Sequence, residues 1–158
     1  MSKGSGTKVA FDIKQPVQFL ALGFGSGLAP KAPGTFGTLA AVPLFLLLAM
    51  LTPLYYLLAV IFMSLVGIYI CGKAADDVGV HDHPAIVWDE FVGYFITMFM
   101  VPVSWQSVLV GFLLFRLFDI LKPWPISFID KKMSGGIGIM FDDILAGIFS
   151  LLIMQLIF

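Results

Sequence analysis

Five apolar segments dominate this sequence and restrict what the chain can fold into. They run over Phe36–Leu51, Leu54–Cys71, Phe91–Val103, Trp105–Leu121 and Ile144–Phe158. Of the residues, 59% are hydrophobic and 12% are charged, against roughly 45–50% and about 25% in soluble domains. A chain of 158 residues has a large surface for its volume, and so few charged side chains would cover it poorly. We therefore expect an all-α, polytopic helical membrane protein with about four to five membrane segments.

The charged residues gather on one side of the predicted membrane. The first two segments are joined by Thr52-Pro53 and the next two by Pro102 to Ser104, and neither connection carries a charge. The lysines and acidic residues fall on the other side, where Arg116 lies near its helix end. The positive-inside rule makes that side cytoplasmic. This orientation depends on the count of five segments, and several are shorter than the ~20 residues of a perpendicular span, so re-entrant geometry stays open.

The N-terminal part differs from the apolar segments in composition. Residues 1–16 are polar and lack the pattern of a cleaved signal peptide, so we expect a flexible tail before a single membrane domain over residues 17–158. The stretch from Val17 to Thr38 is rich in glycine and proline, which disfavours a regular spanning helix. Irregular backbone at membrane depth needs protein around it or a wet cavity beside it. We expect a partly embedded loop next to a polar site.

Net charge and cysteine count exclude two classes of protein. A net charge of −1 provides no basic surface for nucleic acid. The single cysteine, Cys71, excludes an intramolecular disulfide framework. The sequence also shows no sign of an obligatory protein partner.

Two acidic pairs occur in similar surroundings. The stretches WDEFVG (88–93) and FDDILAG (141–147) each place an aromatic residue and two acids before a glycine, and each is predicted to open a helix. The acids could simply cap those helices and complement their dipoles. Adjacent carboxylates on one face also repel each other, and a cation such as Mg²⁺ or Mn²⁺ would relieve that repulsion. We therefore take Asp89, Glu90, Asp142 and Asp143 as candidate metal ligands.

A third group of charges lies near the end of a predicted helix. Arg116, Asp119 and Lys122 are spaced i, i+3 and i+6, which puts them broadly on one side. Arg116 and Asp119 could be a neutralising pair. Ionisable groups in membrane segments are costly, however, and are functional by default. Because arginine suits bidentate phosphate recognition and lysine supplies a mobile charge, Arg116 and Lys122 are candidate phosphate-binding residues.

Weaker candidates come from the histidines and the glycine-rich loop. His81 and His83 could transfer protons or could be exposed loop residues, since an H-x-H triplet alone is a weak metal signal. Successive amides of the loop could form an anion-binding nest, although the spacing of a Walker motif is absent. Its polar side chains are additional phosphate-binding candidates, namely Ser26, Lys31, Thr35 and Thr38.

Four motifs resemble a known family. They are GFGSGLAPKAPGTFGTLAAVP (23–43), GVHDHPAIVWDEFVG (79–93), FRLFDILKPWPI (115–126) and GGIGIMFDDILAG (135–147). In this order they resemble bacterial phosphatidylglycerophosphatase A over almost the whole chain after the tail. The resemblance implies a Mg²⁺-dependent lipid phosphatase of the bacterial inner membrane, acting at the cytoplasmic face. It also implies a phospholipid substrate, phosphatidylglycerophosphate, whose terminal phosphate is removed to leave phosphatidylglycerol.

A mechanistic hypothesis assigns a role to each candidate. Asp89, Glu90, Asp142 and Asp143 hold one or two Mg²⁺ ions, with Asp119 nearby. Arg116 and Lys122 neutralise the phosphate oxygens, helped by the loop. A water molecule attacks the phosphorus, and His81 or another acid protonates the departing glycerol oxygen. A covalent aspartyl-phosphate route through one of the acids stays open.

Two alternatives compete with this hypothesis. The enzyme could be a phosphatase for another lipid, such as phosphatidic acid. The chain could also be a small membrane transporter, whose polar residues should then be distributed through the membrane depth and over both faces. Crowding of the charges at one face favours an enzyme at the membrane interface.

Overall fold

The regular elements of the protein are helices wherever the structure describes the chain. The computed structural model describes residues 11–79 and 83–158, and no strand occurs in those ranges. The elements are α1 (Pro16–Ala21), the short helix η2 (Ser26–Leu28), α2 (Pro33–Leu48), α3 (Pro53–Val78), α4 (Trp88–Thr97), α5 (Trp105–Leu121), α6 (Ile126–Lys132) and α7 (Gly135–Ile157). The expectation of an all-α fold is confirmed. The division into a tail over residues 1–16 and a domain over 17–158 stays a prediction.

Two helices in the described part of the chain are long and apolar enough to cross a membrane, α3 and α7. Only 28% of the apolar window of α3 and 50% of that of α7 are buried inside the protein, so both present apolar side chains outward. α2 is apolar but has 16 residues, and α4 has 10. The fold therefore supports membrane association through two helices, and four to five spans stay a prediction.

Local sequence explains where the long helices begin and end. Pro53 occupies the first position of α3, and the Thr52 hydroxyl caps it by accepting the N–H of Tyr55. Gly79 ends α3 in the left-handed conformation, with φ 74°. α5 opens with a capping box in which Ser104 and Ser107 each accept the other's backbone N–H. These signals lie in the sequence itself, and the bounds of α5 agree residue for residue with the predicted segment.

Other helix boundaries differ from the expected segments. α2 begins at Pro33, inside the stretch expected to be irregular, because proline is favoured at the first helical position. α4 ends at Thr97 rather than continuing to Val103, and Met100 just beyond it has a positive φ of 57°. α7 begins at Gly135 rather than near Asp142. The helix α6 was not expected from the sequence.

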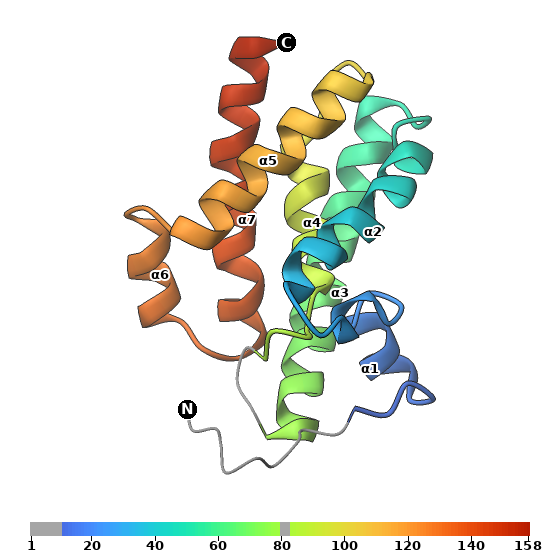
Figure 1. The fold of residues 1–158 in the computed structure, drawn as a ribbon, viewed down its shortest axis with the longest axis vertical. Helices are drawn as coiled ribbons and strands as arrows, with labels where there is room; N and C mark the ends of the chain where they lie inside the picture. Colours follow the sequence, from blue (N-terminus) through green and yellow to red (C-terminus); the bar gives the residue numbers. More distant parts are fainter. Residues whose placement is uncertain (1–10, 80–82) are drawn as a thin grey trace.

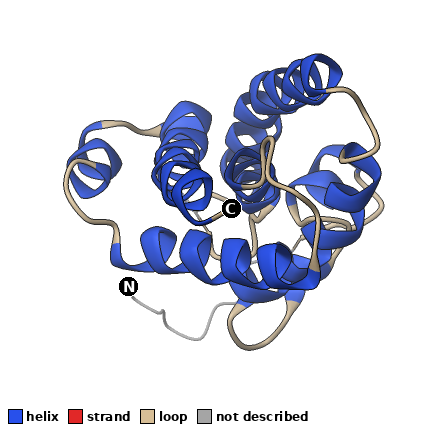
Figure 2. Ribbon diagram, turned by 90° about the horizontal axis from the view of Figure 1, so that it is seen from above, coloured by secondary structure: helices blue, strands red, loops and turns tan. Residues whose placement is uncertain are grey.

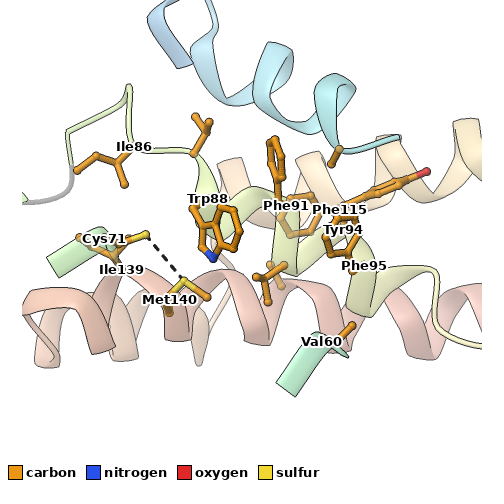
Figure 3. Close-up of a cluster of buried hydrophobic side chains, with 14 of the residues drawn as sticks. Val60, Cys71, Ile86, Trp88, Phe91, Tyr94, Phe95, Phe115, Ile139 and Met140 are labelled. Carbon is orange, nitrogen blue, oxygen red and sulfur yellow. Dashed lines mark hydrogen bonds between the residues drawn. The ribbon is translucent and has the colours of Figure 1, made fainter. Parts of the chain in front are cut away.

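α4 lies at the centre of the fold. It packs against α2, α3, α5 and α7, and Figure 1 shows it between them. Figure 2 shows the bundle from above, with helices joined by loops and no strand in the described part of the chain. Nine of the ten residues of α4 are buried, including Phe91, Tyr94 and Phe95. These rings belong to the hydrophobic core together with Trp88 and Phe115, as Figure 3 shows. In the same core Cys71 of α3 contacts Met140 of α7.

The two ends of the bundle are occupied by different connections. Figure 1 shows the C-terminus and the α2–α3 and α4–α5 connections at one end, with α1 toward the other. The start of α4 and the end of α5 point away from the C-terminal end, and the first half of α7 runs beside them. This arrangement brings the charged ends of separate helices together.

Candidate active site

Seven charged side chains from three helices line one cavity of about 370 Å³. α4 contributes the pair Asp89 and Glu90, and α7 contributes Asp142 and Asp143. The end of α5 contributes the remaining three, which are Arg116, Asp119 and Lys122. We call this space the acid cavity. The structure therefore brings together every strongly weighted candidate of the sequence, although they span more than fifty positions in the chain.

The two acidic pairs occupy different positions in their helices. Asp89 and Glu90 lie in the first turn of α4, as predicted, and the Asp89 carboxylate accepts the Glu90 N–H at 3.0 Å. Asp142 and Asp143 do not open a helix, because α7 begins at Gly135 and they lie about two turns inside it. That expectation was wrong. Helix capping therefore does not explain the second pair, which is only 2% exposed at each residue.

Ion pairs join the basic and acidic side chains of the cavity. Arg116 Nη1 pairs with Asp119 and lies 4.0 Å from Glu90 Oε1. Lys122 Nζ donates to Asp142 Oδ2 at 2.9 Å and lies 3.6 Å from Asp119 Oδ1. The neutralising Arg116–Asp119 pair considered from the sequence is thus present. It is one part of a network that links α4, α5 and α7.

Lys122 stays protonated in this surrounding. Burial alone would lower the pKa of Lys122, but the charge and hydrogen bond of Asp142 raise it, with Asp143 and Asp119 adding to the effect. The net result is a pKa above the ordinary value for lysine. Lys122 therefore serves as a fixed positive charge at the cavity.

The carboxylates outnumber the cations, and their arrangement fits a divalent metal. Five acids face two bases in the cavity. Oxygens of Asp89, Asp142 and Asp143 lie within 4.8 Å of one another, as do oxygens of Glu90, Asp119 and Asp143. Within residues 11–79 and 83–158, the buried atoms Glu90 Oε2 and Asp143 Oδ2 have no hydrogen-bond donor. Because buried polar atoms are normally satisfied, and because hard oxygen ligands suit Mg²⁺, these residues fit such an ion.

The start of α2 completes the cavity. Ala32, Pro33 and Gly34 line it beside the acids. A Cβ at Gly34 would lie 2.9 Å from both Arg116 Nη1 and Glu90 Oε1, so a larger residue there would displace the end of one of these side chains. Pro33 has no N–H, and the N–H groups of Thr35 and Phe36 both bond to the Ala32 carbonyl, which leaves Gly34 as the backbone donor of this turn.

The polar side chains of the glycine-rich loop do not line the acid cavity. The hydroxyls of Ser26 and Thr38 each donate to a backbone carbonyl, those of Gly23 and Gly34, at 2.8 Å. Thr35 and the exposed Lys31 are likewise not among the residues that line the cavity. His81 lies outside the described residues. The loop thus lines the cavity at residues 32–34, and the role of its polar side chains in phosphate binding stays a prediction.

His83 lines the acid cavity, although the sequence did not distinguish it from His81. Its Nδ1 accepts the N–H of Ala85 at 3.0 Å, and its ring packs edge-on against Phe11. Burial lowers the pKa of His83 below the ordinary value. The neighbouring Pro84 and Ile86 line the cavity as well. No signal in the H-x-H triplet itself indicates which histidine faces the site.

Comparison with known proteins identifies the family of this chain. The family model of phosphatidylglycerophosphatase A matches residues 19–158, which include every residue of the acid cavity. The chain belongs to the phosphatidylglycerophosphatase A family. It is 48% identical to phosphatidylglycerophosphatase A of Escherichia coli (strain K12) over 144 residues, covering 90% of this chain and 84% of that protein. It is 50% identical to the Haemophilus influenzae protein of the same name over 140 residues, covering 87% and 86%.

A third relative shows that names differ among similar chains. A Bacteroides thetaiotaomicron protein is 37% identical over 142 residues, covering 85% of this chain and 88% of its own. It bears phosphatidylinositol-3-phosphatase as a provisional name. No solved structure matches the chain.

Proposed function

We propose that this protein hydrolyses the terminal phosphomonoester of phosphatidylglycerophosphate, giving phosphatidylglycerol and inorganic phosphate. The observation that carries the proposal is the acid cavity, in which five carboxylates, an arginine and a lysine meet in a chain of the phosphatidylglycerophosphatase A family. Carboxylates that bind a metal and cations that bind phosphate are the two components that phosphomonoester hydrolysis needs.

The proposed cofactor is Mg²⁺, bound as one or two ions. Asp89, Asp142 and Asp143 form one candidate ligand group, and Glu90, Asp119 and Asp143 form the other. Asp143 belongs to both groups, which suits two neighbouring ions that share a carboxylate. A bound Mg²⁺ would supply Lewis acidity that polarises the phosphate and neutralises its charge.

Arg116 and Lys122 bind and orient the phosphate group. Both lie at the end of α5 within the cavity, and Arg116 Nε has no hydrogen-bond partner in the described part of the chain. The guanidinium can therefore donate its Nε–H to a phosphate oxygen while Nη1 keeps its pair with Asp119. The start of α2 lines the same space at Ala32, Pro33 and Gly34.

The remaining chemistry is the transfer of the phosphoryl group to water. In the simpler route a water molecule attacks phosphorus, the ester bond breaks, and an acidic group protonates the departing glycerol oxygen. His81 was assigned that last role from the sequence. In the other route a carboxylate attacks first, and water then hydrolyses the aspartyl phosphate. Trapping of a phosphorylated enzyme would select the second route.

The membrane arrangement proposed here is a multi-pass protein of the bacterial inner membrane with its acid cavity facing the cytoplasm. Residues 49–53 and 98–104, at the C-terminal end of the bundle, contain no charged residue. The described lysines and acids lie in segments toward the other end, as the positive-inside rule requires of a cytoplasmic side. Four to five segments would then cross or enter the bilayer, with the short α4 enclosed by its neighbours.

A phosphatase for a different lipid is the second candidate function. The relative with a provisional phosphatidylinositol-3-phosphatase name is 37% identical to this chain, so similar sequences are associated with another phosphorylated headgroup. The acid cavity explains recognition of a phosphomonoester, which both substrates contain.

The test measures phosphate release by purified protein from phosphatidylglycerophosphate, phosphatidic acid and phosphatidylinositol 3-phosphate, with and without Mg²⁺. Asp89→Asn and Asp143→Asn remove one cavity carboxylate each, and Asp76→Asn removes an exposed acid of α3 as the matched control. We expect release from phosphatidylglycerophosphate that the first two variants abolish and the control retains. No release by the wild-type protein would refute the proposed substrate. Full activity of folded cavity variants would refute the site.

A further inference from the structure

His83 lies at the boundary between the acid cavity and a second hollow. It lines the acid cavity, and with Pro33 and Pro84 it also lines an adjoining hollow of about 400 Å³ beside η2. A ligand with its phosphate among the acids would extend past this ring if its organic part entered the hollow. Neither the proposed metal ligands nor the proposed phosphate-binding cations include His83.

The orientation of the ring fixes which nitrogen carries a proton. Nδ1 accepts the Ala85 N–H at 3.0 Å, so its lone pair is occupied and it carries no hydrogen. A neutral imidazole with an unprotonated Nδ1 carries its proton on Nε2. The edge-on contact with Phe11, at 5.1 Å between ring centres, holds the ring from another side. His83 is therefore a neutral hydrogen-bond donor at a defined place.

His83 offers a hydrogen-bond donor that is not paired with a carboxylate of the cavity, unlike the two cations. Arg116 and Lys122 are both engaged with carboxylates of the cavity. The hydrogen bond between His83 and its own loop is made through Nδ1, so Nε2 is not used in holding the turn at Ala85. A donor fixed before substrate arrives costs little reorganisation when charge develops on an ester oxygen.

We propose that His83 binds the substrate directly, with its Nε2–H donating a hydrogen bond to an oxygen of the phosphate ester at the boundary of the two hollows. The proposal rests on the proposed phosphatase function and adds a substrate contact to it. His83 in this role stabilises charge but does not deliver the proton to the leaving group, because its neutral ring would have to become an anion. That proton comes from another acid.

Two amide substitutions distinguish the roles of the two nitrogens of the His83 ring. In His83→Asn the amide branches at the position of Nδ1, so its oxygen can accept the Ala85 N–H in an Asx-turn while the distal donor is lost. In His83→Gln the amide lies one carbon farther out, which places an N–H₂ donor near the position of Nε2. His83→Ala removes both. The series thus distinguishes a substrate contact from a brace of the loop.

The first measurement is kcat/KM with phosphatidylglycerophosphate and Mg²⁺. We expect a loss of roughly 100-fold in His83→Ala and His83→Asn, with His83→Gln at least tenfold more active than either, because a preorganised donor has an effect of this size. Recovery by asparagine and not by glutamine would show that the Ala85 bond is what matters, and it would overturn the proposal. An equal loss in all three would also overturn it.

The second measurement does not depend on hydrolysis. Inorganic phosphate with Mg²⁺ should raise the temperature of thermal unfolding of the wild type, since a ligand that binds only the folded state stabilises it. We expect this shift to be smaller in His83→Asn and retained in His83→Gln. If the wild type hydrolyses no lipid but shows this pattern, the proposed function is wrong and the His83 contact stands. If the wild type hydrolyses the lipid while all variants match it in both measurements, the function stands and the contact is refuted.

Discussion

At the end of the bundle where α4 begins and α5 ends, seven charged side chains line one cavity, whereas the residues of the α2–α3 and α4–α5 connections at the opposite end carry no charge. The polar groups of the uncharged end are used within the fold. The Ser107 hydroxyl donates to the Pro102 carbonyl at 2.7 Å, and Gln155 Nε2 donates to the Phe99 carbonyl at 3.0 Å. At the charged end, buried carboxylate oxygens of Glu90 and Asp143 find no donor among the residues that the structure describes.

The difference separates stability from function. Burying several carboxylates beside one another opposes folding, because each loses hydration and repels its neighbours. The connections at the uncharged end have no such conflict, since they contain no charged residue. Local conflicts of this kind are expected where a site is held ready for a ligand. Changes at the charged end should therefore alter activity and metal response, and changes at the other end should alter stability alone.

The largest effect should come from removing the metal. Chelation should abolish phosphate release, and added Mg²⁺ should restore it. Mg²⁺ at about 100 times its Kd should also stabilise the folded wild type by about 2.7 kcal/mol, seen as a rise in Tm. Asp143→Asn should lose both responses, because Asp143 belongs to both candidate ligand groups. If the chelated protein is as active as the Mg²⁺-loaded one, the metal plays no part in the difference between the two ends.

A smaller effect is expected where the backbone meets the acid cavity. In Gly34→Ala the new Cβ would lie 2.9 Å from Arg116 Nη1 and Glu90 Oε1, so the guanidinium must move. We expect kcat/KM to fall roughly 10- to 100-fold, the size seen when a catalytic group is misplaced by about 1 Å. Thermal unfolding should change little.

Gly136→Ala is the opposite case. Its Cβ would collide with the Ile68 carbonyl oxygen of α3, away from the cavity lining. Overpacking of this kind costs about 1–3 kcal/mol, which should appear as a lower Tm with activity kept in the folded fraction. If Gly34→Ala loses stability and Gly136→Ala loses activity instead, the separation of the two roles is wrong.

The sequence predicted some elements well because their signals are local. α5 opens with the capping box, in which Ser104 is the N-cap and Ser107 lies in the first turn, and it ends at Leu121, before Lys122-Pro123. The gathering of charges on one side followed from their positions between apolar segments. The roles of the individual acids stay predictions, although the structure places them together.

Other features depend on contacts between distant segments. The start of α7 at Gly135 was missed because a glycine-rich stretch reads as a loop, whereas Gly136 lets α7 pack against the Ile68 carbonyl of α3. His83 was not separated from His81 because its hydrogen bond to Ala85 depends on how the turn before α4 is folded. Neither contact can be predicted from the spacing of residues along the chain.

The smallest effect should come from the uncharged end. Ser104→Ala removes the hydroxyl that accepts the Ser107 N–H at 3.1 Å, so α5 loses its N-cap. We expect a loss of about 1 kcal/mol in the free energy of unfolding, measured as a lower Tm in detergent, with kcat/KM unchanged. Ser104→Thr should keep most of the stability, because threonine also caps helices. Ser64→Ala is the matched control, since the Ser64 hydroxyl donates to the Val60 carbonyl within α3 and caps nothing. A loss of activity in folded Ser104→Ala would show that the uncharged end is coupled to the acid cavity through α5.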